Sequence, residues 1–123
     1  MYQVVFYEDA SGVSELWDFL DDLLQRSSGS KDARIQHKQV VYYIELLQRN
    51  GTRLPETITK NIVEDIWELR PGDNRVFYFF FRDNTFVLLH HFRKKSQKTP
   101  QREIDRAIAE RDDFLSRKGG KKT

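Results

Sequence analysis

The chain has 123 residues, a formal net charge of +2 and no cysteine. This length predicts one domain, and the lack of cysteine excludes disulfides, thiolate metal sites and a cysteine nucleophile. The apolar run after Met1 is too short for a signal-peptide core, so we expect a cytoplasmic protein that does not contact a membrane. The charge is uneven: residues 1–25 carry six acids and no base, whereas residues 93–123 carry eleven bases and five acids.

The spacing of apolar residues predicts seven elements in one folded unit over residues 1–115, followed by a flexible basic tail over 116–123. In chain order the elements are a strand at 2–7, a helix capped by Ser11 or Ser14, a helix at 33–49, strands at 62–69, 76–81 and 85–92, and a helix with Thr99 as its N-cap and Pro100 in its first position.

Short turns join the last three strands and exclude parallel crossovers, which predicts an antiparallel meander. The two early helices allow the first strand to return to the same sheet. The order strand, helix, helix, three strands, helix therefore predicts an α+β fold, in which helices pack on one face of a small antiparallel sheet.

The chemical signals in the sequence are cationic. It contains no Gly-rich phosphate loop, no paired carboxylates and no metal-ligand spacing, so we expect no cofactor or metal. His90 and His91 are adjacent on a strand and point to opposite faces, so they cannot both bind one ion. The meander places the end of its first strand, the start of its second and the end of its third at one edge. Arg70, Arg75 and the Arg93–Lys95 cluster should converge there.

An exposed and uncompensated cluster of this kind suits a phosphodiester-sized anion, because arginine can bind two phosphate oxygens at once. Exposed cations are also ordinary beside turns and at strand ends. The pattern alone therefore leaves two interpretations open, an anion site and a solvated strand edge.

Three motifs between residues 68 and 107 resemble those of the phage-derived HigB-like toxins of the RelE/ParE superfamily. They are "ELR" at 68–70, "RVFY" at 75–78 and "FRKKSQKTP" at 92–100, which leads to a helix bearing "EIDRA". Lys60 also matches a basic position that precedes the second strand of that family. His91 departs from the family pattern, which usually has glycine there.

The resemblance implies a RelE-like fold and the toxin of a type II toxin–antitoxin pair, which cleaves mRNA in the ribosomal A site. It implies a HigA-like antitoxin with a helix-turn-helix domain as partner, and we expect the complex to be a heterotetramer. The alternative is a ParE-like toxin that inhibits DNA gyrase by protein contact and cuts no RNA.

Such cleavage needs no metal, because the 2′-hydroxyl of RNA can attack the adjacent phosphate. His90 or His91 is the candidate base, depending on register: a three-residue loop puts His91 on the face of Arg75, and a two- or four-residue loop puts His90 there. The expected catalytic residues are Arg70, Arg75, Lys94, Lys95 and His91, with Lys94 or Lys95 as proton donor or electrostatic stabiliser. The expected RNA-binding residues are Lys60, Arg93, Lys98 and His90.

Overall fold

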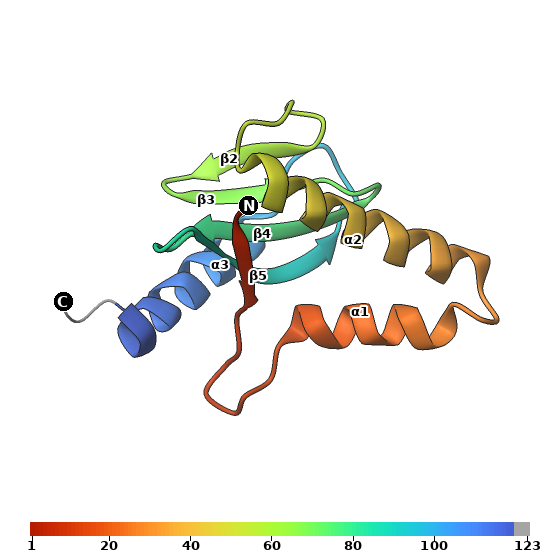
Figure 1. Cartoon of the computed structure of the whole chain (residues 1–123), viewed down its shortest axis with the longest axis horizontal. Helices are drawn as coiled ribbons and strands as arrows, with labels where there is room; N and C mark the ends of the chain where they lie inside the picture. The colour runs from red at the N-terminus through yellow and green to blue at the C-terminus, as the bar shows by residue number, and fades with distance from the viewer. Residues whose placement is uncertain (120–123) are drawn as a thin grey trace.

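The structure is a computed structural model that describes residues 1–119. Over these residues it contains five strands, three α-helices and one π-helical turn, and it begins with a strand (Figure 1). The elements are β1 (Gln3–Phe6), α1 (Glu15–Arg26), α2 (Lys31–Asn50), β2 (Thr59–Val63), β3 (Ile66–Leu69), β4 (Asn74–Phe80), β5 (Thr85–Arg93), α3 (Gln101–Phe114) and η1 (Leu115–Gly119). The α+β class is confirmed. No helix in this part of the chain is long and apolar enough to cross a membrane.

All five strands form one sheet in the order β1-β5-β4-β3-β2. Strands β2 to β5 are antiparallel to their neighbours, as the short turns predict. β1 is parallel to β5, with Gln3 opposite Thr85 and Phe6 opposite Leu88, so the expectation of a purely antiparallel sheet is wrong. Short turns fix the direction only of strands that follow each other, and β1 is separated from β5 by most of the chain.

The strand expected at 62–69 is a hairpin of two strands, so the sheet has one strand more than the sequence predicts. β2 and β3 are antiparallel and meet at Glu64 and Asp65, where Glu64 has a φ of 50°. The side chain of Asn61 donates to the carbonyl oxygen of Glu64 at 2.9 Å and supports this turn. Two adjacent acids within the apolar run were the signal for the turn.

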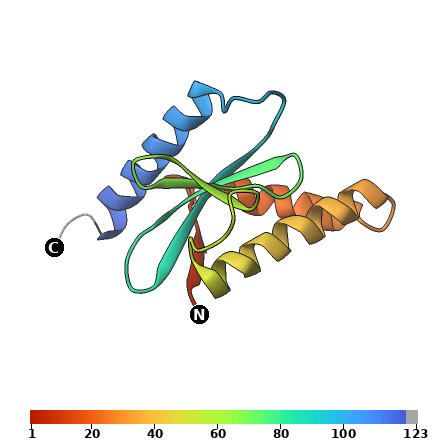
Figure 2. The same cartoon turned by 90° about the horizontal axis from the view of Figure 1, so that it is seen from above.

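Helices cover both faces of the sheet, so the expectation of one covered face is wrong. Figure 2 shows the sheet between the α1–α2 pair on one side and α3 on the other. Leu16 and Leu47 pack from the first pair, and Ala107 and Phe114 pack from α3. Residues 76–79 of β4 are all buried, and a strand that is apolar at every position is typical of a sheet covered on both faces.

The observed helix ends agree only partly with the ends predicted from the sequence. Ser14 and Ser30 cap α1 and α2, each accepting a hydrogen bond from the backbone N–H three residues later. α2 ends at Gly51, whose φ of 61° lies in the left-handed region that favours glycine. Pro100 is the N-cap of α3 and has no side-chain cap bond, so the expectation of Thr99 as the cap is wrong by one position.

The C-terminal part of the described chain continues α3. η1 follows Phe114 directly, and its Arg117 donates to the Asp113 carboxylate at 2.6 Å. The Tyr7 hydroxyl donates to the same carboxylate at 2.7 Å, which joins this end of the chain to the residue after β1. The expected basic tail thus begins in a helical turn, and its residues 120–123 lie outside the described part.

His91 holds α1 against β5. Its ring stacks on Phe19, with ring centroids 3.5 Å apart and 12° between the planes. Its Nδ1 lies 2.6 Å from Glu15 Oε2, and its backbone N–H donates to Glu15 Oε1 at 3.1 Å. Burial acts to raise the pKa of Glu15, but the hydrogen bonds and charge of His91 outweigh it, so this pKa is lowered.

We expect Glu15→Gln to lower the melting temperature by a few degrees at about pH 6, because it removes the charge that faces His91. The contribution of Glu15 is complete above its unfolded pKa of about 4.3 and is lost as the pH falls through its lower folded pKa. The difference in melting temperature between Glu15→Gln and wild type should therefore be smaller at about pH 3 than at about pH 6. Glu45→Gln, at an exposed position of α2, is the control. A difference independent of pH would contradict this interpretation.

Candidate functional site

Three strand ends and the segment after β5 meet at one end of the sheet and form a small pocket. The turn at 70–73 joins β3 to β4, and β5 ends beside it with Arg93 opposite Asn74. The Lys94 N–H donates to the Asp73 carbonyl oxygen at 2.7 Å and ties the segment after β5 to this turn. The cations that line the pocket are Arg70, Arg75, Lys94, Lys95 and Lys98.

The two arginines share a buried carboxylate. Glu68 of β3 is 1% exposed, and its Oε2 accepts a hydrogen bond from Arg70 Nε at 2.8 Å and lies 3.8 Å from Arg75 Nε. Arg75 is 8% exposed and donates to the carbonyl oxygens of Gly72 and Asn74. Burial lowers the pKa of Arg75, and the charge of Glu68 opposes this change. The expectation of an exposed, uncompensated cation is therefore wrong for Arg75.

The lysines give the pocket its excess positive charge. All three lie on the 94–99 segment between β5 and α3, where Lys95 and Lys98 are exposed and Lys94 is half-buried. Five cations surround a single carboxylate, so the pocket is electropositive at its open side. Such a surface attracts a polyanion and can form charge-assisted hydrogen bonds with phosphate oxygens.

Two of the expected RNA-binding cations lie outside the pocket lining. Lys60 is exposed on β2, directly opposite Glu68 in the β2–β3 register, and so lies on the same face of the sheet. Arg93 turns toward α2, where its Nη1 donates to Gln36 Oε1 at 2.9 Å and its Nη2 lies 3.8 Å from the Asp73 carboxylate. Lys60 therefore extends the pocket surface, and Arg93 borders it from the opposite face.

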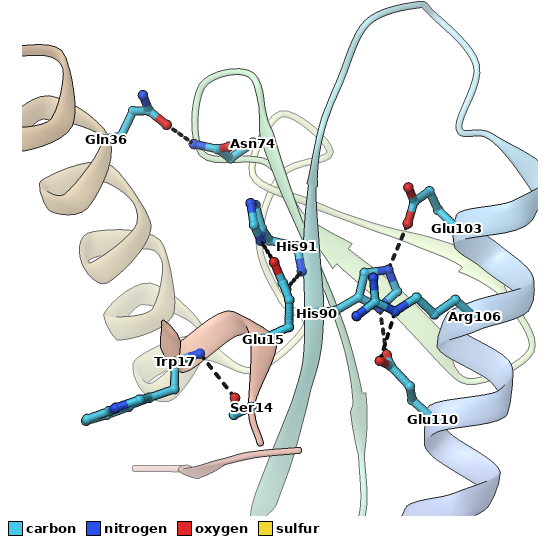
Figure 3. Close-up of polar contacts among 10 residues, drawn as sticks. All are labelled: Ser14, Glu15, Trp17, Gln36, Asn74, His90, His91, Glu103, Arg106 and Glu110. Carbon is cyan, nitrogen blue, oxygen red and sulfur yellow. Dashed lines mark hydrogen bonds and ion pairs between the residues drawn. The ribbon is translucent and has the colours of Figure 1, made fainter. Parts of the chain in front are cut away.

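A β-bulge decides where the two histidines point. Near the β4–β5 turn Phe80 pairs with Phe86, a register that would place His91 opposite Arg75. The register then shifts by one residue, so that Arg75 lies opposite Phe92. Figure 3 shows the result, with His90 on the α3 side of β5 and His91 on the α1 side.

Neither histidine lines the pocket. His90 is fully buried, with Nδ1 2.6 Å from Glu110 Oε1 and Nε2 3.0 Å from Glu103 Oε1 (Figure 3). Arg106 Nε donates to the other oxygen of Glu110 at 3.1 Å. His91 packs against α1 on the opposite face of the sheet. The structure thus places neither His91 as a base nor His90 as an RNA contact within the pocket.

Glu68 is a charged pocket residue that was not among the expected site residues, because it entered only as part of the "ELR" motif. Its position contains a usable signal: by the period-2 alternation of a strand, Glu68 shares a face with the apolar Ile66, which is buried on the α3 side of the sheet. A buried acid is rare unless it is paired, and here Arg70 and Arg75 supply the partners. Within residues 1–119, no group of three His, Asp or Glu side chains is placed to hold a metal ion.

Comparison with known proteins gives one family match. A family model described as "Phage derived protein Gp49-like (DUF891)" matches residues 29–112. This range extends from the start of α2 into α3 and includes every residue that lines the pocket. No curated protein matches the chain.

The buried pairing of Arg75 predicts a stability effect that an exposed cation would not have. Arg75→Ala should lower the free energy of unfolding by about 3 kcal/mol, because it leaves Glu68 buried with less compensation. Lys95→Ala, at an exposed position, should change it by less than about 0.5 kcal/mol. Urea denaturation of both variants measures the difference. Equal free energies of unfolding for the two variants would show that the pairing of Arg75 with Glu68 adds no measurable stability.

Proposed function

Because the chain belongs to the phage-derived Gp49-like family, a family associated with toxin–antitoxin systems, we propose that it is a toxin that stops translation by cutting mRNA on the ribosome. One observation carries this proposal: five cations, from the turn after β3, the start of β4 and the segment after β5, converge on a single pocket. The HigB-like motifs at 68–70, 75–78 and 92–100 contain all five of these cations.

The pocket has the groups that phosphodiester cleavage requires. Attack by the 2′-hydroxyl concentrates negative charge on the phosphate oxygens, and fixed cations stabilise that charge. Arg70 and Arg75 are held in place by Glu68, so they offer their charge without reorganisation. Lys94 and Lys95 line the same pocket, where either can stabilise the leaving oxygen or donate a proton to it.

The ribosome supplies what the pocket lacks. The pocket is small, and its lining contains one aromatic ring, Phe92, which is buried. It therefore offers no platform for stacking RNA bases, and orientation of the mRNA must come from elsewhere. We propose that an mRNA held in the ribosomal A site provides it, which places the protein in the cytoplasm. We therefore expect the purified protein to cleave naked RNA poorly.

A second surface suits the proposed antitoxin. α1 and α2 border a groove of about 330 Å³, beside which Trp17 is 60% and Leu24 is 55% exposed. Asp18 and Asp21 flank Trp17 on the exposed side of α1, and no base precedes Arg26 in the sequence. An amphipathic segment with basic residues would fit this groove. We propose that the helix-turn-helix antitoxin docks here, in a heterotetramer.

The main test is to map the 5′ ends of cellular mRNA after the protein is induced. The wild type should produce new ends within translated codons and arrest growth. Lys95→Ala with Lys98→Ala should abolish both effects while the protein stays folded, because both side chains are exposed. Lys31→Ala with Lys38→Ala removes the same charge from α2 and should leave both effects intact. Growth arrest with uncut mRNA and a DNA-damage response would instead indicate a ParE-like gyrase inhibitor.

Charge reversal separates the two surfaces. Asp18→Lys with Asp21→Lys should weaken antitoxin binding by more than about tenfold, equivalent to roughly 1.4 kcal/mol, and leave growth arrest intact. Lys95→Glu should abolish growth arrest and keep antitoxin affinity within about tenfold. Titration calorimetry with the purified partner measures the affinities. A complex that dissociates on the Lys95 change alone would indicate that the antitoxin covers the pocket directly.

A further inference from the structure

One buried hydrogen-bond acceptor of the pocket has no partner among the described residues. Glu68 Oε1 is buried and has no hydrogen-bond partner among the described residues, although Oε2 is bound by Arg70. Leaving a buried acceptor without a partner costs stability. In a pocket lined by cations, such an atom indicates a role in binding or chemistry.

The chemistry of this oxygen limits what it can bind. Phosphate oxygens of a nucleic acid are acceptors only, so a carboxylate repels the phosphate that the five surrounding cations attract. RNA removes this conflict, because a 2′-hydroxyl lies beside each phosphodiester and can donate to the carboxylate. DNA has no such donor. One carboxylate among five cations therefore fits a ribose hydroxyl next to a phosphate better than it fits a phosphate alone.

We propose that Glu68 is the general base of the RNA cleavage, an inference that rests on the proposed function. Glu68 Oε1 takes the proton of the 2′-hydroxyl while that oxygen bonds to the adjacent phosphorus. The bond from phosphorus to the 5′-oxygen breaks, and this oxygen takes a proton from Lys94 or Lys95. The products are a 2′,3′-cyclic phosphate and a 5′-hydroxyl, and exchange with solvent then restores both protein groups.

No other group in the pocket is placed for this role. Glu68 is the only carboxylate among the lining residues, and the arginines and lysines there are donors. His90 is enclosed by Glu103 and Glu110, and His91 faces α1. The bond from Arg70 fixes Oε2, which leaves Oε1 as the free acceptor.

The substrate reaches Glu68 by displacing part of the pocket wall. In this structure the carboxylate is 1% exposed, and the 94–99 segment forms one side of the pocket above it. This segment contains no helix or strand, and residues 95–98 are exposed. A phosphodiester that binds the lysines of this segment must therefore displace it before the 2′-hydroxyl reaches Glu68 Oε1.

The test is single-turnover cleavage of mRNA on programmed ribosomes with an empty A site. Glu68→Gln keeps the shape of the side chain and should lower the cleavage rate at saturation by about 100-fold or more. Glu68→Asp keeps the charge beside the arginines but moves the oxygens back by one methylene, and should lower the rate at least about tenfold. Glu56→Gln is the matched control, since it removes an exposed acid near Arg70 without touching the pocket.

Binding distinguishes a base from a residue that only holds the arginines. Programmed ribosomes whose mRNA carries a 2′-deoxynucleotide at the cleaved position should bind wild type and Glu68→Gln within about threefold. Weaker binding with an unchanged saturated rate would overturn the proposal, as would wild-type rates for both Glu68 variants. If Glu68→Gln does not fold, Glu68→Asp decides alone. A wild-type protein that cuts no mRNA would refute the proposed function itself.

Discussion

Phe77 of β4 faces two residues of β5, Leu89 and His90, where regular antiparallel pairing would give it one. This bulge shifts the register between the β4–β5 turn and the site. As a result Phe92 lies opposite Arg75, His90 turns into the α3 face and His91 turns into the α1 face. His90 then contacts two carboxylates of α3, and His91 contacts one carboxylate of α1. The extra residue of the bulge thus places one histidine against each helical layer.

The 94–99 segment, which carries the three lysines of the pocket, is held in place at both ends. At its start, the Lys94 N–H binds the Asp73 carbonyl oxygen. At its end, α3 follows its N-cap Pro100 and is bound to β5 through His90, which lies between Glu103 and Glu110. Anchoring the two ends keeps the lysines beside the arginines.

The features that could be predicted from the sequence are those that depend on local residue patterns. Apolar runs and turn residues located the helices and the β4 and β5 strands, and strand pairing correctly brought Arg70, Arg75 and Lys94 together. It did not predict the bulge, because loop length gives the register only near the turn. It also did not predict the burial of Arg75, since that depends on Glu68 lying on the same sheet face. The second helical layer was foreseeable, because residues 76–80 of β4 are all apolar or aromatic.

The two charged surfaces lie on different sides of the sheet, and this separation constrains how a partner can act. The pocket residues Glu68 and Arg75 share the face of α3, whereas the acidic groove lies between α1 and α2 on the other face. A partner that fills the groove leaves Glu68 and its arginines uncovered. Under the proposed function such a partner can still prevent cleavage, because a substrate held inside the ribosome is reached only by a protein small enough to enter. The proposed dependence on the ribosome would thus let an antitoxin neutralise the protein without contacting Glu68 or its arginines.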